Sequence, residues 1–335
     1  MLFWKRPPHT EQTSHPLFNA RSGETASLLE HSSQKFHRTI DRTAQDFMFR
    51  AIHPPIASEK LHSPIASTIE SLLRTFSLLS ATRTAVDLAL HDWMGKKVGL
   101  PLWQIWGLDR RRIVPTSVTI GISSPEAAKQ RMLQWLDVTT VKAVKVKLGS
   151  PEGLAADRAM LQAVREVAPS DAKFSVDANG GWTVEQAIEM AHWLNDHGIT
   201  YIEQPLPAGQ EADLPQVYRR SPLPIFVDES CFTSRDIPAL ADRVNGINIK
   251  LMKSGGLTEA LRMIYTARAC GLQVMFGCYS DSALSNTAAA QLAPLADHLD
   301  LDSHLNLKDD PFVGATMKDG CLIPSDAPGL GVDRA

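Results

Sequence analysis

Three acidic residues follow short β-branched segments of the chain at regular intervals. Asp177, Glu203 and Asp228 end the segments FSVD, YIE and FVD, and they lie 203 − 177 = 26 and 228 − 203 = 25 residues apart. That interval is typical of one strand–helix repeat, so consecutive parallel strands would bring the three carboxylates to one point. A set of carboxylate ligands that includes no cysteine thiolate and no histidine imidazole suits Mg²⁺. Any one acid alone would suit capping or salt bridging, but three in register favour a metal site.

Three lysines lie where they could move protons or stabilise negative charge. Lys145 and Lys147 alternate in AVKVKLG and therefore share a face, where burial would require anionic partners. Lys250 ends the segment GINIK. A lysine whose pKa is lowered by burial and by neighbouring cations can act as a base, with a protonated lysine as the acid. Lys145 would stay charged and stabilise an enolate oxygen, and the simpler alternative for Lys250 is a side chain that snorkels at the rim.

Eight strand candidates position these side chains. They are Thr116–Ile122, Ala143–Leu148, Phe174–Ala178, Tyr201–Gln204, Ile225–Glu229, Ile247–Lys250, Val274–Gly277 and Leu299–Asp302. Amphipathic stretches separate them, which predicts an α/β fold, a (β/α)8 TIM-type barrel. The second and sixth strands of such a barrel face each other, so Lys147 and Lys250 would approach a substrate from opposite sides. The alternative is an open doubly wound sheet, but no GxGxxG turn follows the first strand.

Helix signals lie between the strands and before them. Pro125 and Pro151 each fit a first helical turn, and Thr183 with Gln186 has capping-box spacing. A further helix is expected at Ala81–Lys97, ended by Gly99 and Pro101. Its apolar face would hold Val86, Leu90, Trp93 and Met94.

The bulk composition indicates a globular protein whose partner is a small molecule. The 335 residues, 44% of them hydrophobic, suffice for a barrel and an appended domain. A formal net charge of −3 disfavours nucleic acid and anionic membranes as partners. The chain has neither a long apolar run nor a secretory signal at its start, which predicts a cytoplasmic location. Four widely spaced cysteines argue against a zinc knuckle or a disulfide framework, and the sequence is compatible with a homo-oligomer.

Five short motifs together resemble the enolase superfamily, specifically its muconate lactonizing subgroup. They are KVK at 145–147, DANGGW at 177–182, EQP at 203–205, DES at 228–230 and KLMKSGG at 250–256. The resemblance covers roughly Ser80 to Val332, and it implies Mg²⁺ on the three acids and an acid/base pair of Lys147 and Lys250. Asn179 and Glu229 lie just past two of the acids and are expected to hold water or orient the ligands.

The eighth strand candidate, in LDLDSHL, looks like the Asp-x-Asp motif of dipeptide epimerases, the group that contains L-Ala-D/L-Glu epimerase. Alternation would put Asp300 and Asp302 on one face, where they could hold the ammonium of a dipeptide. The alternative is that they cap a following helix. By the same resemblance Thr119, Cys278 and Ser280 would contact substrate, together with Lys145. Tyr279 and Asp281 depart from the Met and Glu usual in the family.

The resemblance also implies an N-terminal α+β capping domain. We expect this domain at 1–112, the barrel at 113–320, and a segment at 321–335 that returns to the cap. Residues 1–62 are atypical, because they lack the expected Gly-x-Gly-Glu turn, and a divergent, truncated or misread cap would explain this. They carry six histidines without ligand spacing, which we expect to be solvated: His9, His15, His31, His37, His53 and His62.

The sequence thus predicts a Mg²⁺-dependent dipeptide epimerase that moves the α-proton of the C-terminal residue through an enolate. Within the same superfamily, the alternatives are an N-acylamino-acid racemase, an o-succinylbenzoate synthase or a cycloisomerase. A catalytically inactive barrel that serves as a binding protein is the alternative from another class.

Overall fold

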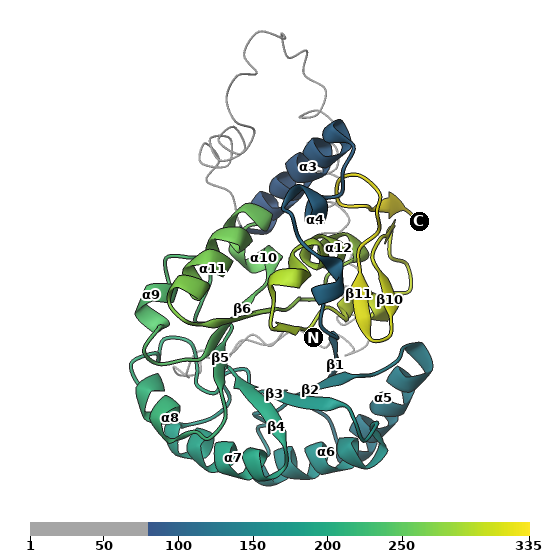
Figure 1. The fold of residues 1–335 in the computed structure, drawn as a ribbon. Helices are drawn as coiled ribbons and strands as arrows, with labels where there is room; N and C mark the ends of the chain where they lie inside the picture. The colour runs from purple at the N-terminus through teal and green to yellow at the C-terminus, as the bar shows by residue number, and fades with distance from the viewer. Residues whose placement is uncertain (1–79) are drawn as a thin grey trace, which may run out of the picture. The chain divides into compact units, whose positions relative to one another are not determined.

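The computed structural model describes residues 80–335, whose strands form a ring surrounded by helices (Figure 1). Eight strands pair in parallel in chain order. They are β1 (Ser117–Ile120), β2 (Ala143–Lys147), β3 (Lys173–Asp177), β4 (Ile199–Glu203), β5 (Ile225–Val227), β6 (Gly246–Ile249), β7 (Gln273–Phe276) and β8 (His298–Leu299). A parallel bridge between Thr116 and Leu299 joins the two ends of the sheet. The predicted (β/α)8 barrel is confirmed, and the open doubly wound sheet is wrong.

The observed strands end earlier than predicted. Strand β5 ends at Val227 and β8 at Leu299, whereas the sequence predicted Glu229 and Asp302 as their last residues. Asp228 and Asp300 therefore follow their strands directly instead of ending them.

Within residues 80–335, eight helices surround the strands, and the sequence predicted the start of three of them, two correctly. They are α5 (Pro125–Val138), α6 (Leu154–Val167), α7 (Val184–Asp196), α8 (Leu214–Arg220), α9 (Ile237–Leu240), α10 (Leu251–Ser254), α11 (Leu257–Ala269) and α12 (Ala283–Leu292). Pro125 occupies the first turn of α5, and Thr183 and Gln186 form the predicted capping box of α7. The expectation for Pro151 is wrong, since α6 starts only at Leu154, after Gly153 with φ of 91°.

The helix predicted before the barrel is present as α3 (Ser80–Val98), which is followed by α4 (Leu102–Ile105). The predicted apolar face is wrong, because the buried positions of α3 are Thr84, Asp87, Leu88, His91 and Gly95. Polar groups are buried here since α3 lies against the start of α11, where the Asp87 carboxylate accepts hydrogen bonds from two backbone N–H groups.

The C-terminal residues contact the segment that precedes the barrel. Strands β10 (Thr316–Lys318) and β11 (Cys321–Ile323) form a hairpin, and β12 (Asp333–Arg334) pairs with β9 (Phe312–Val313). Leu102 N donates to Gly329 O at 3.1 Å, and Gly329 N donates to Leu100 O at 3.0 Å. The domain boundaries themselves remain a prediction. Segment 1–62 with its six histidines lies outside the described residues.

Period-two alternation divides the barrel interior into an apolar layer and a polar layer. Tyr201, Phe226 and Met275 form a buried cluster, and the Tyr201 and Phe226 ring centroids are 4.8 Å apart. Gly246 makes room for it, since a Cβ there would lie 2.2 Å from the Phe226 ring. Two residues further along β4 and β5 the same face carries acids. The apolar layer therefore closes one end of the barrel beneath the polar groups. Among the described residues no helix is long and apolar enough to cross a membrane.

Candidate active site

The three predicted acids meet at the carboxyl ends of β3, β4 and β5. Asp177 pairs in register with Lys147 on one side and with Glu203 on the other. Asp228 follows β5 by one residue, and its backbone N–H donates to the Gln204 side chain at 2.8 Å. All three carboxylates are buried. The structure thus brings the acids together as the spacing of the sequence predicted.

Each acid is paired with one of the predicted lysines. Lys147 Nζ lies 2.5 Å from Asp177 Oδ2, and Lys250 Nζ lies 2.6 Å from Asp228 Oδ2. Lys145 Nζ lies 2.5 Å from Glu203 Oε2 and is fully buried. Lys250 is 5% exposed, so its side chain does not snorkel to solvent. With β2 and β6 four strands apart in the ring, Lys147 and Lys250 reach the polar layer from opposite walls.

The pKa values of these lysines differ from the sequence expectation. Burial lowers the pKa of Lys147, and Lys145 lowers it further, but the charges of Asp177 and Glu203 raise that pKa to a net increase. Burial likewise lowers the pKa of Lys250. The charges of Asp228 and Glu203 raise it by more, so the pKa of Lys250 is raised overall. The expectation of lowered values is wrong for this structure because the ammonium groups are in direct contact with carboxylates.

The chemistry of the acids fits a hard divalent cation. In the described part of the chain, no three acidic, histidine or cysteine side chains form a ready-made ligand cluster, because the carboxylates turn to the lysines. Burial raises the pKa of Glu203, and the charges of Asp177 and Asp228 raise it further against the effect of Lys145. Asp228 Oδ2 accepts no well-formed hydrogen bond, although Lys250 is close. A divalent cation would relieve this repulsion, so the oxygen donors fit Mg²⁺.

Asp300 and Asp302 lie just past β8 and differ in their surroundings. Asp300 accepts from Ser117 Oγ at 2.7 Å and from Thr119 Oγ1 at 3.0 Å, and it forms an ion pair of 2.7 Å with Lys145. Burial raises the pKa of Asp300, but the charges of Lys145 and Lys147 and the hydrogen bonds from Lys145 and Ser117 together lower that pKa to about 2. The ionised form of Asp300 is therefore favoured, and its oxygens already have partners.

Asp302 has fewer partners and remains available to a ligand. It stands at the first position before a 3₁₀ turn (Ser303–Asn306), yet its side chain does not cap that turn. Its Oδ2 instead accepts from Thr119 N at 2.7 Å. Burial and then the charge of Asp300 raise the pKa of Asp302 to about 7. The capping alternative is wrong for this carboxylate, which is the better placed of the two to receive a cation.

The remaining predicted contacts come from the loop after β7. Cys278 Sγ donates to Asp300 O at 3.1 Å, and burial raises the pKa of this thiol to about 12. Ser280 is exposed. The Tyr279 ring, where the family usually has Met, lies with its centroid 4.7 Å from Lys250 Nζ. Asp281 turns back to the Tyr279 backbone N–H at 3.3 Å. This wall of the site is therefore aromatic and carries a cation–π contact.

Asn179 and Glu229 lie beside the acids as predicted. Asn179 donates to Asp177 through its backbone N–H at 2.8 Å and through Nδ2 at 3.3 Å. Its Nδ2 also lies 3.4 Å from Glu229 Oε1. Burial, together with the charges of Asp228 and Asp177, raises the pKa of Glu229 to about 7. These contacts are compatible with the expected role of orienting ligands.

Two further polar residues, which the sequence reasoning did not single out, complete the group. Lys253 in α10 donates to Asp228 Oδ1 at 2.7 Å, to Asp228 O at 2.6 Å and to Asn248 O at 3.0 Å. Asn248 Nδ2 donates to Glu203 Oε1 at 2.5 Å. Asn248 in β6 lies two residues before Lys250, a spacing that period two could have revealed. Lys253 belongs to the following helix, so the alternation of side chains along a strand does not predict its direction.

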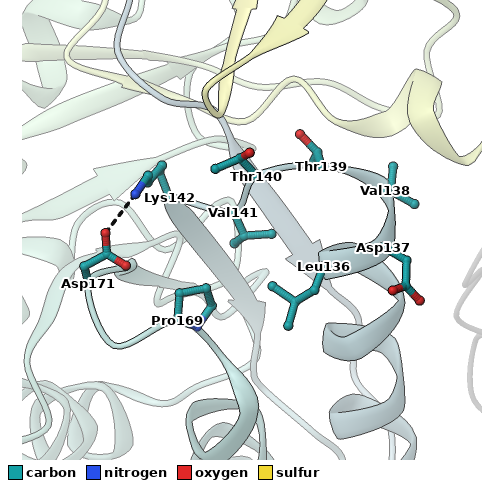
Figure 2. A pocket seen from close by; sticks show the side chains of 9 residues that line it. All are labelled: Leu136, Asp137, Val138, Thr139, Thr140, Val141, Lys142, Pro169 and Asp171. Carbon is teal, nitrogen blue, oxygen red and sulfur yellow. Dashed lines mark hydrogen bonds and ion pairs between the residues drawn. The ribbon is translucent and has the colours of Figure 1, made fainter.

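A surface pocket of about 460 Å³, drawn in Figure 2, shares no lining residue with this group. It is lined by the end of α5 and by the two loops that lead into β2 and β3, where Lys142 pairs with Asp171 at 2.8 Å. These loops lie at the amino ends of the strands, whereas the predicted site residues follow the carboxyl ends. The pocket is therefore on the wrong side of the barrel for the predicted chemistry.

Comparison with known proteins identifies relatives of this chain by sequence and by structure. The model of the family described as enolase C-terminal domain-like matches residues 127–334. A hydrophobic dipeptide epimerase of a Flavobacteria bacterium is 47% identical over 82% of this chain and 80% of its own length. A second one, from Roseobacter litoralis, is 49% identical over 74% of this chain and 72% of its own. The crystal structure of an Enterococcus faecalis dipeptide epimerase with Mg and L-Leu-L-Tyr is 33% identical, with a TM-score of 0.73 over 81% of this chain and 77% of that chain. The chain belongs to the enolase C-terminal domain-like family.

Proposed function

We propose that this protein is a Mg²⁺-dependent dipeptide epimerase, an isomerase that inverts the α-carbon of the C-terminal residue of a dipeptide. The observation that carries the proposal is the placement of two lysines at either side of three carboxylates: half-buried Lys147 ends β2, and buried Lys250 directly follows β6 on the opposite wall of the barrel. Relatives at 47% and 49% identity are named hydrophobic dipeptide epimerases, which supports the same activity. A dipeptide is therefore the proposed partner.

The proposed roles follow from position and charge. One lysine of the pair removes the α-proton, and the other returns a proton on the opposite face of the carbon. Lys145, held as a cation by Glu203 and Asp300, stabilises the negative charge that develops on the substrate carboxylate. Bound Mg²⁺ supplies further positive charge there, with Asp177, Glu203 and Asp228 as its ligands.

The rival activities use the same lysines on other substrates. An N-acylamino-acid racemase, an o-succinylbenzoate synthase and a cycloisomerase act on molecules without a free ammonium, so the ionised form of Asp302 would have no cationic partner in their substrates. The inactive barrel is disfavoured because a buried assembly of lysines and acids is costly to retain without a function. Asp302 thus favours a dipeptide.

Exchange in D₂O tests the proposal. The purified protein is incubated with Mg²⁺ and a library of dipeptides in D₂O, and mass spectrometry detects α-deuterium. We expect incorporation into the C-terminal residue of a subset of dipeptides. Turnover of an N-acylamino acid with no exchange in any dipeptide would replace this function by the racemase, and no exchange in either class would support the inactive barrel.

The titration of Asp302 predicts how activity depends on pH. Its carboxylate faces Asp300, Lys145 and Cys278, and burial followed by Asp300 raises its pKa to about 7. Below that pH Asp302 becomes neutral and loses its attraction for an ammonium. We therefore expect kcat/KM to fall by about tenfold per unit below pH 7, while deprotonation of the substrate amine limits the rate above about pH 8.

Replacement of Asp302 checks this assignment. Asp302→Asn should lower kcat/KM at pH 7.5 by about 10- to 100-fold, because a hydrogen bond to a charged group contributes about 1.5–3 kcal/mol. The acid limb near pH 7 should disappear from the profile of this variant. The exposed Asp309 gives the matched control, and Asp309→Asn should keep the wild-type profile. An unaltered acid limb in Asp302→Asn would assign the titration to another group.

We further propose a cytoplasmic location. All four cysteines are in the described part of the chain, and all four are free thiols. Reduced cysteines are typical of proteins of the cytoplasm.

A further inference from the structure

Asn248 binds one of the proposed metal ligands directly and is linked to a second through Lys253. Its side-chain Nδ2 donates to Glu203 Oε1 at 2.5 Å. Its backbone carbonyl accepts from Lys253 Nζ at 3.0 Å, and the same ammonium donates to Asp228 Oδ1 at 2.7 Å. One residue of β6 is thus connected to acids that follow or end β4 and β5.

Among residues 80–335, two side chains donate hydrogen bonds to the Glu203 carboxylate. Lys145 binds Oε2 and Asn248 binds Oε1, so each oxygen has one donor. Asn248 itself is fully buried. Its amide lies against Gly277, where an added Cβ would come within 2.7 Å of both amide atoms. The bare backbone of Gly277 therefore provides the space in which the amide is held.

Charge distinguishes the two donors to Glu203. The ammonium of Lys145 both orients and neutralises the carboxylate, whereas the amide of Asn248 can only orient it. Asn248 Oδ1 is buried and accepts no hydrogen bond, so the amide does not serve a second partner through that atom. A buried polar group with an unsatisfied acceptor is costly. The hydrogen bond from Nδ2 to Glu203 offsets part of that cost.

We infer that Asn248 is a positioning residue for the metal site: it holds Glu203 in the orientation in which the carboxylate binds a divalent cation. The inference rests on the metal site of the proposed function. It predicts that loss of the amide weakens metal binding without removing any charge from the site, because partners of metal ligands typically contribute 10- to 100-fold in affinity.

Two variants of Asn248 test the inference. Asn248→Ala removes the amide and leaves a cavity, and Asn248→Leu removes it at nearly unchanged shape. Isothermal titration calorimetry with Mn²⁺, without substrate, measures the dissociation constant of the full-length protein. We expect this constant to rise by about 10- to 100-fold in both variants. The rise of the melting temperature on addition of Mn²⁺ gives the same affinity for a variant of reduced stability.

The chain offers a matched control on the same strand. Asn245 directly precedes β6, and its Oδ1 accepts from Ile225 N at 2.9 Å at the amino end of the barrel. Asn245→Ala should lower the melting temperature but leave the Mn²⁺ dissociation constant within about twofold, as expected for sites that are far apart. Unchanged Mn²⁺ affinity in Asn248→Ala and Asn248→Leu, with normal wild-type binding, would overturn the inference alone. A wild-type protein that binds no Mn²⁺ would overturn the proposed metal site and the inference with it.

Discussion

Single replacement of Lys147 or Lys250 by methionine is expected to lower kcat for epimerisation by about 10²- to 10⁴-fold, the usual contribution of a general acid or base. Methionine preserves most of the side-chain volume. Neither change leaves an acid without a donor, because Lys253 still binds Asp228 and Asn179 still binds Asp177. The loss should therefore report on proton transfer and not on unfolding, which a melting curve verifies.

Deuterium exchange should separate the two lysines. If each serves one face of the α-carbon, a variant that retains only Lys250 can still exchange the α-proton of the stereoisomer whose proton faces that lysine. It cannot complete inversion. Lys147→Met and Lys250→Met should therefore exchange opposite stereoisomers in D₂O, each with retention of configuration, as followed by proton NMR of the α-position.

Lys142 provides the control for these changes. It immediately precedes β2, five residues before Lys147, and pairs with Asp171 at the opposite end of the barrel (Figure 2). Lys142→Met should epimerise at the wild-type rate, because a surface ion pair contributes little to stability. Full epimerisation by either active-site variant, or exchange of the same stereoisomer by both, would contradict two-sided proton transfer.

The placement of the acids was predictable because two regularities of the sequence agree. Intervals of about one strand–helix repeat place Asp177, Glu203 and Asp228 on neighbouring strands, and alternation decides which side chains enter the barrel. Lys145 and Lys147 follow the same alternation, so both could be expected to point into the barrel and to pair with these acids. Two independent periods that point to one place are a stronger signal than any single motif.

Other features depend on packing that the sequence pattern does not encode. Asp87 is buried in α3 because its carboxylate accepts hydrogen bonds from the start of α11, a contact across 170 residues of chain. A search for apolar positions at helical spacing therefore chose the wrong face, with Leu90 and Trp93 on it. Lys253 was missed for a related reason, because it reaches Asp228 from a short helix, α10, and not from a strand.

The charge state of the site could not be read from residue types either. Burial lowers the pKa of a lysine, and a neighbouring carboxylate raises it, so the sign depends on distances below about 3 Å. At 2.5 Å from Asp177, Lys147 has a raised pKa. Lowered values were expected from burial and neighbouring cations alone. The direct ion pairs reverse the balance between the two effects.

The second large effect is expected from Glu203, whose replacement should remove both activity and the response of stability to Mg²⁺. Glu203→Gln keeps the shape of the side chain and loses the charge of the central acid, which lies between Asp177 and Asp228. A metal ion contributes several kcal/mol to stabilising developing charge, so kcat/KM should fall by at least about 10³-fold. Treatment of the wild-type protein with EDTA should have the same effect, and Mg²⁺ should restore activity.

Thermal unfolding gives a readout of this change that does not depend on catalysis. A ligand at about 100 times its dissociation constant stabilises the folded state by about 2.7 kcal/mol, so Mg²⁺ should raise the melting temperature of the wild-type protein. Glu203→Gln should show little or no such rise. Glu166, which pairs with Lys129 on the surface, gives the matched control, and Glu166→Gln should respond to Mg²⁺ like the wild type. An undiminished response in Glu203→Gln would mean that the ion is bound without this carboxylate, and the ligand set would have to be sought elsewhere in the chain.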